Sequence, residues 1–207
     1  MRILQMSDLH ASEAALERSR WALREFAPHL FLVTGDITNF GPLDYVRRLF
    51  EDVPIPSYAI PGNCDPRETV PLLEDLGVNL HGKRTEVRGH PLIGLGGSSP
   101  TPFHTPFELS EEEIRAALEP LMVEGSILAT HSPPYGHVDT LAGRHLGSRS
   151  LRTLVERYPP RLVLCGHIHE ARGVETGATT YVNPGPARNG HAALVDLGEE
   201  VRVRLLP

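Results

Sequence analysis

Apolar positions in the first part of the chain follow two alternating spacings. Short runs of consecutive aliphatic residues are separated by stretches whose apolar residues recur at helical spacing. The runs cover residues 3–6, 30–34 and 57–60, and the helical stretches cover residues 14–26 and 43–50. This order predicts a βαβαβ unit, in which helices connect the strands of a sheet.

Shorter elements are expected along the rest of the chain. In order, they are a helix at 69–76, short strands within 78–95, a helix at 110–118, a strand at 127–130, a helix at 148–157 and a strand at 162–165. The helix at 110–118 begins at a capping box formed by Ser110 and Glu113. Residues 96–109 and 132–147 are rich in Pro, Gly, Ser and Thr and predict loops. The tail, 172–207, alternates apolar and polar residues in strand-length pieces and predicts an antiparallel end to the sheet.

The length of 207 residues fits a single globular domain over residues 1–207. The order of strands and helices predicts an α/β fold with two sheet portions packed inside helices. No segment is long and apolar enough to cross a bilayer, and residues 1–10 lack the features of a secretion signal. Two cysteines without a pairing pattern suit a reducing compartment, so a cytoplasmic location is expected. The net charge of −6 disfavours long nucleic acid as a partner.

Polar residues able to bind metal ions follow directly after the apolar runs. They are Asp8, His10, Asp36, Asn63, His131, His167 and His169. Residues at the carboxyl ends of strands in an open α/β sheet converge in space, although they are far apart in the sequence. The spacing of two in Asp8-x-His10 and His167-x-His169 places each pair on one side of an extended backbone. The sequence therefore predicts a metal centre.

The donor set of imidazole, carboxylate and amide groups suits Mn, Fe, Co, Ni or Zn better than Cu(I) or an iron–sulfur cluster. The Asp36 carboxylate has two oxygens and is able to bridge two ions. Two ions roughly 3.5–4 Å apart would activate a bridging water and stabilise an in-line phosphoryl displacement. We therefore expect two divalent ions, with manganese as the first choice.

The order of these motifs resembles the calcineurin-like metallophosphoesterases. The motifs are Asp8-x-His10, Gly35-Asp36, Gly62-Asn63-Cys64-Asp65, His131 and Gly166-His167-Ile168-His169. Finer strings, among them GGSSPTPF, GHIHEARG and VNPGP, are similar to the prokaryotic Icc-related phosphoesterases.

The resemblance implies a four-layer α/β/β/α sandwich with two mixed sheets flanked by helices. One ion would take Asp8, His10 and His169, and the other Asn63, His131 and His167, while Asp36 and a hydroxide bridge them. It also implies catalytic roles for Asp36, Asn63 and His131, with the hydroxide as the in-line nucleophile.

Cys64 departs from the usual motif, in which a histidine contacts the phosphate and protonates the leaving oxygen. A thiol is a weak hydrogen-bond donor and stays largely protonated at neutral pH. Losing a cationic imidazole weakens binding of a dianionic monoester more than of a monoanionic diester. The sequence therefore favours a phosphodiesterase acting on a small substrate such as a cyclic nucleotide.

Several other residues are expected near the substrate. Asn63, Cys64, His104 and His145 are candidate substrate contacts, and Asp65 is expected to orient the ligands. Arg144, Arg149 and Arg188 are further candidates for a phosphate oxygen, although exposed arginines are common. The competing functions are a nuclease acting on DNA or RNA and a non-catalytic binding scaffold with the same fold. The complete ligand set argues against the scaffold.

Overall fold

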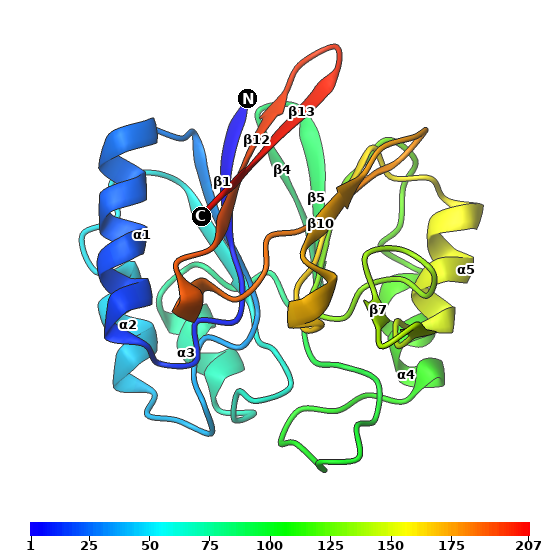
Figure 1. The fold of residues 1–207 in the computed structure, drawn as a ribbon, viewed down its shortest axis with the longest axis horizontal. Coiled ribbons are helices and arrows are strands. Elements are labelled where there is room, and N and C mark those ends of the chain that lie inside the picture. The colour runs from blue at the N-terminus through cyan, green and yellow to red at the C-terminus, as the bar shows by residue number, and fades with distance from the viewer.

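The computed structural model describes residues 1–207 and places two sheets face to face between two groups of helices (Figure 1). The first sheet contains, in order across it, β13 (Val201–Leu206), β12 (Ala192–Leu197), β1 (Arg2–Met6), β2 (Leu30–Thr34) and β3 (Ser57–Ile60). The second contains β10 (Gly173–Glu175), β11 (Thr180–Asn183), β9 (Leu162–Leu164), β6 (Ile127–Thr130), β5 (His90–Leu95) and β4 (Lys83–Val87). Both sheets are mixed. In the first, β1, β2 and β3 are parallel and β12 and β13 add antiparallel strands on one side. In the second, the parallel strands β11, β9, β6 and β5 lie between the antiparallel edge strands β10 and β4.

Helices cover the outer face of each sheet. They are α1 (Glu13–Phe26), α2 (Asp44–Phe50) and α3 (Thr69–Asp75) on the first sheet, and α4 (Glu111–Leu118) and α5 (Arg149–Arg157) on the second (Figure 1). Two short 3₁₀ helices, η1 (His169–Ala171) and η2 (Ala187–Asn189), lie near the ends of strands. The predicted four-layer α/β/β/α arrangement is confirmed.

Each boundary between layers contains its own hydrophobic cluster. Leu16 of α1 and Phe31 of β2 belong to the outer cluster of the first sheet, and Leu154 of α5 and Val163 of β9 to that of the second. A third cluster lies between the sheets. Strand β2 is buried along its whole length, because it has a packed layer on both faces. Edge strand β13 instead alternates partly buried and exposed positions before the buried Leu206, as its sequence VRVRLL indicates.

The predicted elements appear close to their expected bounds. The βαβαβ unit is present, with β1 parallel to β2 and β2 parallel to β3. The Ser110 side chain accepts a hydrogen bond from the Glu113 backbone N–H, and the Glu113 side chain bonds back to the N–H of Ser110. The predicted capping box is therefore confirmed.

The loop expected at 132–147 differs from its prediction, because it contains a small hairpin. Its strands are β7 (Thr140–Leu141) and β8 (Arg144–His145). Both strands are only two residues long and lie on the surface, so no apolar alternation marked them in the sequence. No helix combines the length and apolar character needed to cross a membrane. The extent of the domain, 1–207, stays a prediction.

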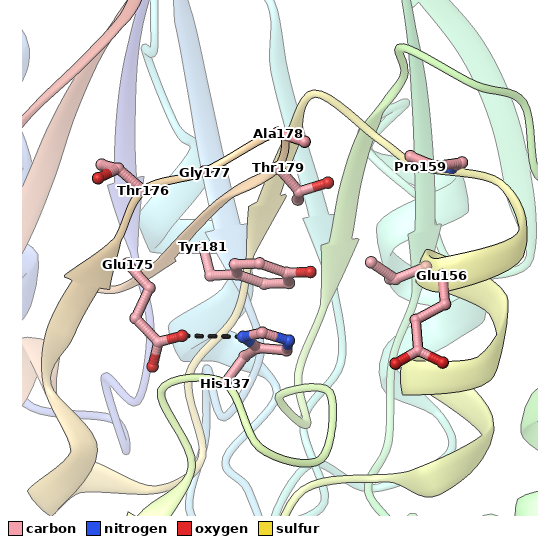
Figure 2. Close-up of a pocket in the computed structure, with 10 residues that line it drawn as sticks. His137, Glu156, Pro159, Glu175, Thr176, Gly177, Ala178, Thr179 and Tyr181 are labelled. Carbon is pink, nitrogen blue, oxygen red and sulfur yellow. Dashed lines mark hydrogen bonds and ion pairs between the residues drawn. The ribbon is translucent and has the colours of Figure 1, made fainter.

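One open cleft lies near the amino ends of β9 and β11, and we call it the His137 cleft (Figure 2). Its volume is about 330 Å³, and its lining includes His137, Glu175, Tyr181 and Glu156. The rings of His137 and Tyr181 stack with centroids 4.0 Å apart, and His137 Nδ1 lies 2.8 Å from a carboxylate oxygen of Glu175. The second Glu175 oxygen accepts the backbone N–H of Val138 at 2.8 Å.

Candidate metal centre

All the predicted ligands lie just beyond the carboxyl ends of parallel strands. Asp8 and His10 follow β1, Asp36 follows β2, Asn63 follows β3, His131 follows β6, and His167 and His169 follow β9. Four of them adopt left-handed backbone conformations, with φ of 55° at Asp8, 48° at His10, 48° at Asp36 and 69° at His167. Such conformations cost about 1–3 kcal/mol each in non-glycine residues and gather at functional sites. The chain therefore turns sharply at this edge and directs these side chains inward.

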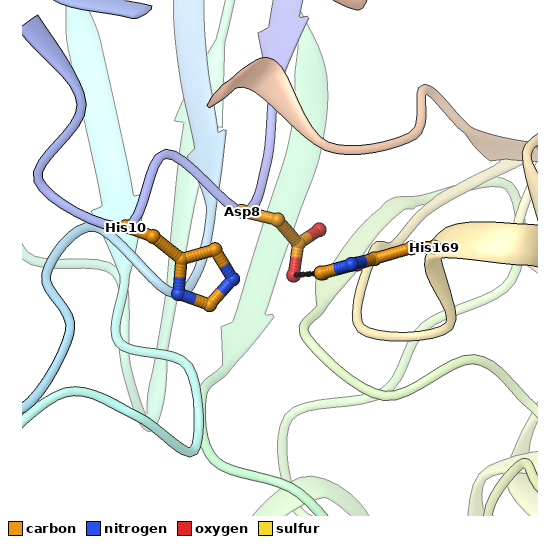
Figure 3. Close-up of side chains that lie close together, drawn as sticks. All are labelled: Asp8, His10 and His169. Carbon is orange, nitrogen blue, oxygen red and sulfur yellow. Dashed lines mark ion pairs between the residues drawn. The ribbon is translucent and has the colours of Figure 1, made fainter. Parts of the chain in front are cut away.

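Asp8, His10 and His169 form the first cluster, with one donor atom from each residue within 4.8 Å of the others (Figure 3). Asp8 Oδ1 lies 3.2 Å from His169 Nε2. Both ring nitrogens of His10 and Oδ1 of Asp8 are buried and make no hydrogen bond. An unsatisfied buried polar atom costs about 1–3 kcal/mol. The cluster therefore has free ligand atoms at the position where a cation would satisfy them.

The two oxygens of Asp36 face different histidines. Oδ2 lies 3.6 Å from His10 Nε2, whereas Oδ1 lies 3.4 Å from His131 Nε2 and accepts the Cys64 backbone N–H at 2.7 Å. Burial alone would raise the pKa of the Asp36 carboxyl, but the facing charges of His131 and His10 lower it below its ordinary value. Asp36 is thus an ionised carboxylate placed between the two halves of the centre.

His131 is fully buried, and its ring nitrogens face three oxygen atoms. Its Nδ1 lies 2.8 Å from the carbonyl oxygen of Thr34, which accepts, so Nδ1 carries the hydrogen. Nε2 then faces Asn63 Oδ1 at 3.0 Å and Asp36 Oδ1 at 3.4 Å. Burial opposes a charge on His131, but the Asp36 carboxylate prevails and raises its pKa to about 9. Three acceptor atoms that face one another require a proton or a metal ion between them.

His167 completes this side of the centre. Its ring centroid lies 5.0 Å from that of His131, and its backbone N–H donates to Asp8 Oδ2 at 3.2 Å. Burial, together with the charge of His131, lowers the pKa of His167 to about 4. A neutral imidazole is the form of histidine that binds metal ions. The donor set and its free buried atoms therefore fit divalent cations.

Comparison with known proteins agrees with this geometry. The sequence profile of the calcineurin-like phosphoesterases matches residues 1–171. The chain belongs to the calcineurin-like phosphoesterase family. This confirms the family predicted from the motifs and makes the chain a metal-dependent phosphoesterase in its general class.

Relatives extend over nearly the whole chain. An uncharacterized protein of Methanocaldococcus jannaschii is 35% identical over 200 residues, covering 90% of this chain and 88% of the relative. A crystal structure from Thermus thermophilus superposes with a TM-score of 0.76 at 21% identity, covering 98% of this chain and 97% of the other. The structure of an archaeal phosphodiesterase superposes with a TM-score of 0.59 at 18% identity and full coverage of both chains. The two solved structures show a shared fold.

Asp65 is fully buried next to the candidate metal centre. Its carboxylate accepts the backbone N–H groups of Ile37, Thr38 and Gly62 at 2.7–3.0 Å, together with the Thr38 hydroxyl at 2.8 Å. These bonds join the turn after Asp36 to the turn that carries Asn63. Burial and the nearby Asp36 charge raise the pKa of Asp65 to about 6. The role of Asp65 in orienting the ligands stays a prediction.

The expected substrate contacts lie in different surroundings: Cys64 is among the candidate ligands, whereas His104 and His145 are exposed. Cys64 has a donor atom within 4.8 Å of those of His10 and Asp36, and burial, with Asp36, raises the pKa of its thiol. His104 is exposed and lies in the 96–109 loop, which is joined to Asn63 by a 3.1 Å hydrogen bond from the Asn63 amide to the Thr105 hydroxyl. His145 is exposed on β8 and pairs with Asp139.

Arg188 reaches the centre more closely than the sequence indicated. Its Nη2 lies 3.5 Å from His169 Nδ1, and its backbone N–H donates to the Asp8 carbonyl at 3.3 Å. In contrast, the Arg149 guanidinium stacks on Tyr135. Nothing local distinguished Arg188 from other surface arginines. The contact of Thr105 with Asn63 likewise has no sequence signal, because it joins two loops that are far apart along the chain.

Proposed function

We propose that this chain is a dinuclear metal-dependent phosphodiesterase that hydrolyses small diesters such as cyclic nucleotides. The placement of Asp36 carries the proposal. Its two oxygens face His10 on one side and His131 on the other, which is the arrangement expected of a carboxylate that bridges two ions. The unpartnered atoms of Asp8 and His10 support the first ion site.

The proposed ligand sets are Asp8, His10 and His169 for one ion and Asn63, His131 and His167 for the other, with Asp36 shared. Two bound divalent ions, with manganese as the first choice, would supply an activated water and stabilise the charge of the phosphoryl group. The Thr34 carbonyl oxygen holds His131 in the tautomer that leaves Nε2 free. The Asn63 amide is held by Thr105, so that its carbonyl oxygen faces the centre.

Preference for diesters follows from Cys64. The Cys64 backbone N–H is used by Asp36, and its neutral side chain adds no positive charge beside the phosphate. A dianionic monoester therefore lacks a cationic partner for its second negative charge. A monoanionic diester carries one charge fewer and needs that partner less. Asn63, Cys64, His104 and His145 remain the proposed substrate contacts.

The proposal is tested by loading the purified protein separately with Mn, Ni, Co and Zn. Bound metal is then quantified, and hydrolysis of bis(para-nitrophenyl) phosphate, para-nitrophenyl phosphate and cyclic nucleotides is measured. Asp36→Asn is the diagnostic variant. Asp196→Asn is its matched control, because Asp196 is a half-exposed carboxylate paired with Arg2 in the first sheet.

We expect two metal ions per chain and faster hydrolysis of the diester than of the monoester. Asp36→Asn should lower activity by more than about 100-fold. Removing a residue that only hydrogen-bonds to a metal ligand costs up to about 100-fold, and Asp36 is proposed as a ligand itself. Asp196→Asn should retain activity. Full activity of Asp36→Asn would refute the bridging role, and faster cleavage of the monoester would refute the diester preference. An intact fold without bound metal would favour the scaffold, and cleavage of DNA or RNA alone would favour the nuclease.

A further inference from the structure

The loop between β6 and α5 is organised around one buried carboxylate. The Asp139 side chain is fully buried, and its Oδ2 accepts the backbone N–H groups of Gly136 and Gly147, each at 2.9 Å. Its Oδ1 lies 2.7 Å from Nδ1 of His145. The carboxylate is thus fixed by backbone donors from both ends of the loop and orients one imidazole.

His145 itself is open to solvent. Its side chain is 44% exposed, whereas that of Asp139 is 0% exposed. The ring lies against Tyr135, with centroids 5.3 Å apart. Because Asp139 accepts the hydrogen of Nδ1, the second nitrogen, Nε2, is the one available to an external group. A buried acceptor that orients an exposed imidazole is the arrangement that holds a histidine ready for proton transfer.

The same loop is connected by hydrogen bonds to the turn that carries the proposed ligands His167 and His169. The Asn183 side-chain amide donates to the carbonyl oxygen of Ile168 at 2.9 Å and lies 3.5 Å from that of Val138, the neighbour of Asp139. Strand β7 also packs against η1, which begins at His169 (Figure 1). The β7–β8 hairpin, which carries His145 on β8, is therefore packed through β7 against the turn that carries His167 and His169.

We propose that His145, oriented by Asp139, is the group that protonates the leaving oxygen of the diester. This inference rests on the proposed function. As the oxygen of water forms its new bond to phosphorus and releases a proton to solvent, the bond from phosphorus to the leaving oxygen breaks and its electron pair moves to that oxygen. The proton on Nε2 of the His145 imidazolium passes to the same oxygen, and His145 then regains a proton from solvent. Asp139 acts as a positioning residue.

Cys64 explains why such a group is needed. A thiol is a weak hydrogen-bond donor, and the Gly-Asn-Cys-Asp motif at 62–65 contains no histidine. A positioned general acid contributes about 10²–10⁴-fold, and it contributes most when the leaving group is a poor one. The dependence on the leaving group therefore separates a proton donor from a residue that only shapes the loop.

The experiment compares two methyl aryl phosphodiesters, one with a para-nitrophenyl and one with an unsubstituted phenyl leaving group. Wild type, His145→Gln and Asp139→Asn are assayed with the same metal loading. His137→Gln is the matched control, because His137 lies in the same loop but pairs with Glu175 in the His137 cleft. Bound metal and thermal unfolding are measured for every variant.

We expect His145→Gln to slow the phenyl ester by about 100-fold or more and the nitrophenyl ester by less than about tenfold. Asp139→Asn should show the same selectivity to a smaller degree and serves as the second variant if His145→Gln is unstable. Metal content should be unchanged in both, and His137→Gln should match wild type.

Equal slowing of both esters, or loss of bound metal in His145→Gln, would overturn the assignment of His145 and leave the proposed function standing. A metal-loaded wild type that cleaves neither ester would instead refute the proposed function itself.

Discussion

The metal centre and the His137 cleft are both lined with histidine and carboxylate groups, yet they differ in whether those groups have partners. In the cleft, His137 pairs with Glu175, whose second oxygen accepts a backbone N–H. In the metal centre, both ring nitrogens of His10 and one oxygen of Asp8 are buried without a hydrogen bond.

The cleft is a hollow of about 330 Å³, but His137, Glu175 and the backbone N–H of Val138 already satisfy one another. Folded proteins rarely leave buried polar atoms unpaired, so the exceptions call for a ligand or another explanation. Unsatisfied ligand atoms are therefore a better guide to function here than the size of a hollow. Backbone strain points the same way, because Asp8, His10 and Asp36 all have positive φ.

The largest expected effect comes from changing one carboxylate to an amide in each region. Asp8→Asn should abolish binding of one ion and lower phosphoesterase activity by more than about 100-fold, because it removes a proposed ligand charge. Glu175→Gln, the matched change in the cleft, should leave activity unchanged and lower the free energy of unfolding by about 1 kcal/mol. Metal analysis, diester hydrolysis and denaturant unfolding measure these effects. A larger loss of activity in Glu175→Gln than in Asp8→Asn would reverse the comparison.

A second prediction concerns His81, a largely buried histidine outside the metal centre that has a partner. Its Nδ1 accepts the Gly96 backbone N–H at 2.9 Å, and burial, with the charge of Arg67, lowers its pKa to about 4. The ordinary pKa of histidine is 6.5, so between pH 6.5 and pH 4 His81 binds a proton more readily in the unfolded chain than in the folded one. Folding stability is thus lost as the pH falls through this range, by up to about 3 kcal/mol.

His81→Asn keeps a hydrogen-bond acceptor without a titrating ring. We expect denaturant unfolding between pH 7.5 and 4 to show a shallower loss of stability in this variant than in wild type, with the difference confined to pH values below about 6.5. Activity at neutral pH should be retained. Parallel stability profiles for the two proteins would show that protonation of His81 does not contribute.

The smallest expected effect comes from adding one methyl group in each region. A Cβ at Gly62 would lie 2.1 Å from Asp36 Oδ1, whereas a Cβ at Gly177 in the cleft would meet nothing closer than 3.7 Å. Gly62→Ala should therefore displace Asp36 and weaken metal binding by about 10–100-fold. Gly177→Ala should leave metal affinity unchanged. Calorimetric titration with Mn tests both, and equal affinities for the two variants would show that the turn at Gly62 yields without moving Asp36.

Much of the fold was predictable because its signals are local. The bounds of β2, β3 and β6 match their aliphatic runs, and the capping box at Ser110 marked the start of α4 within a single turn. The β7–β8 hairpin was missed, because its exposed two-residue strands depend on Asp139 and its partners rather than on an apolar pattern.

The sequence by itself determined the order of the elements, the family and the set of donors at the strand ends, since hydrophobic periodicity and motif spacing are properties of neighbouring residues. Only the tertiary structure decided which atoms meet. Contacts between residues up to 97 positions apart set the two-sided placement of Asp36 and the tautomer of His131. The orientation of His145 depends likewise on its contact with Asp139 in the folded loop. Such contacts form only when strand register and layer packing bring distant turns to one edge, and no local pattern records them.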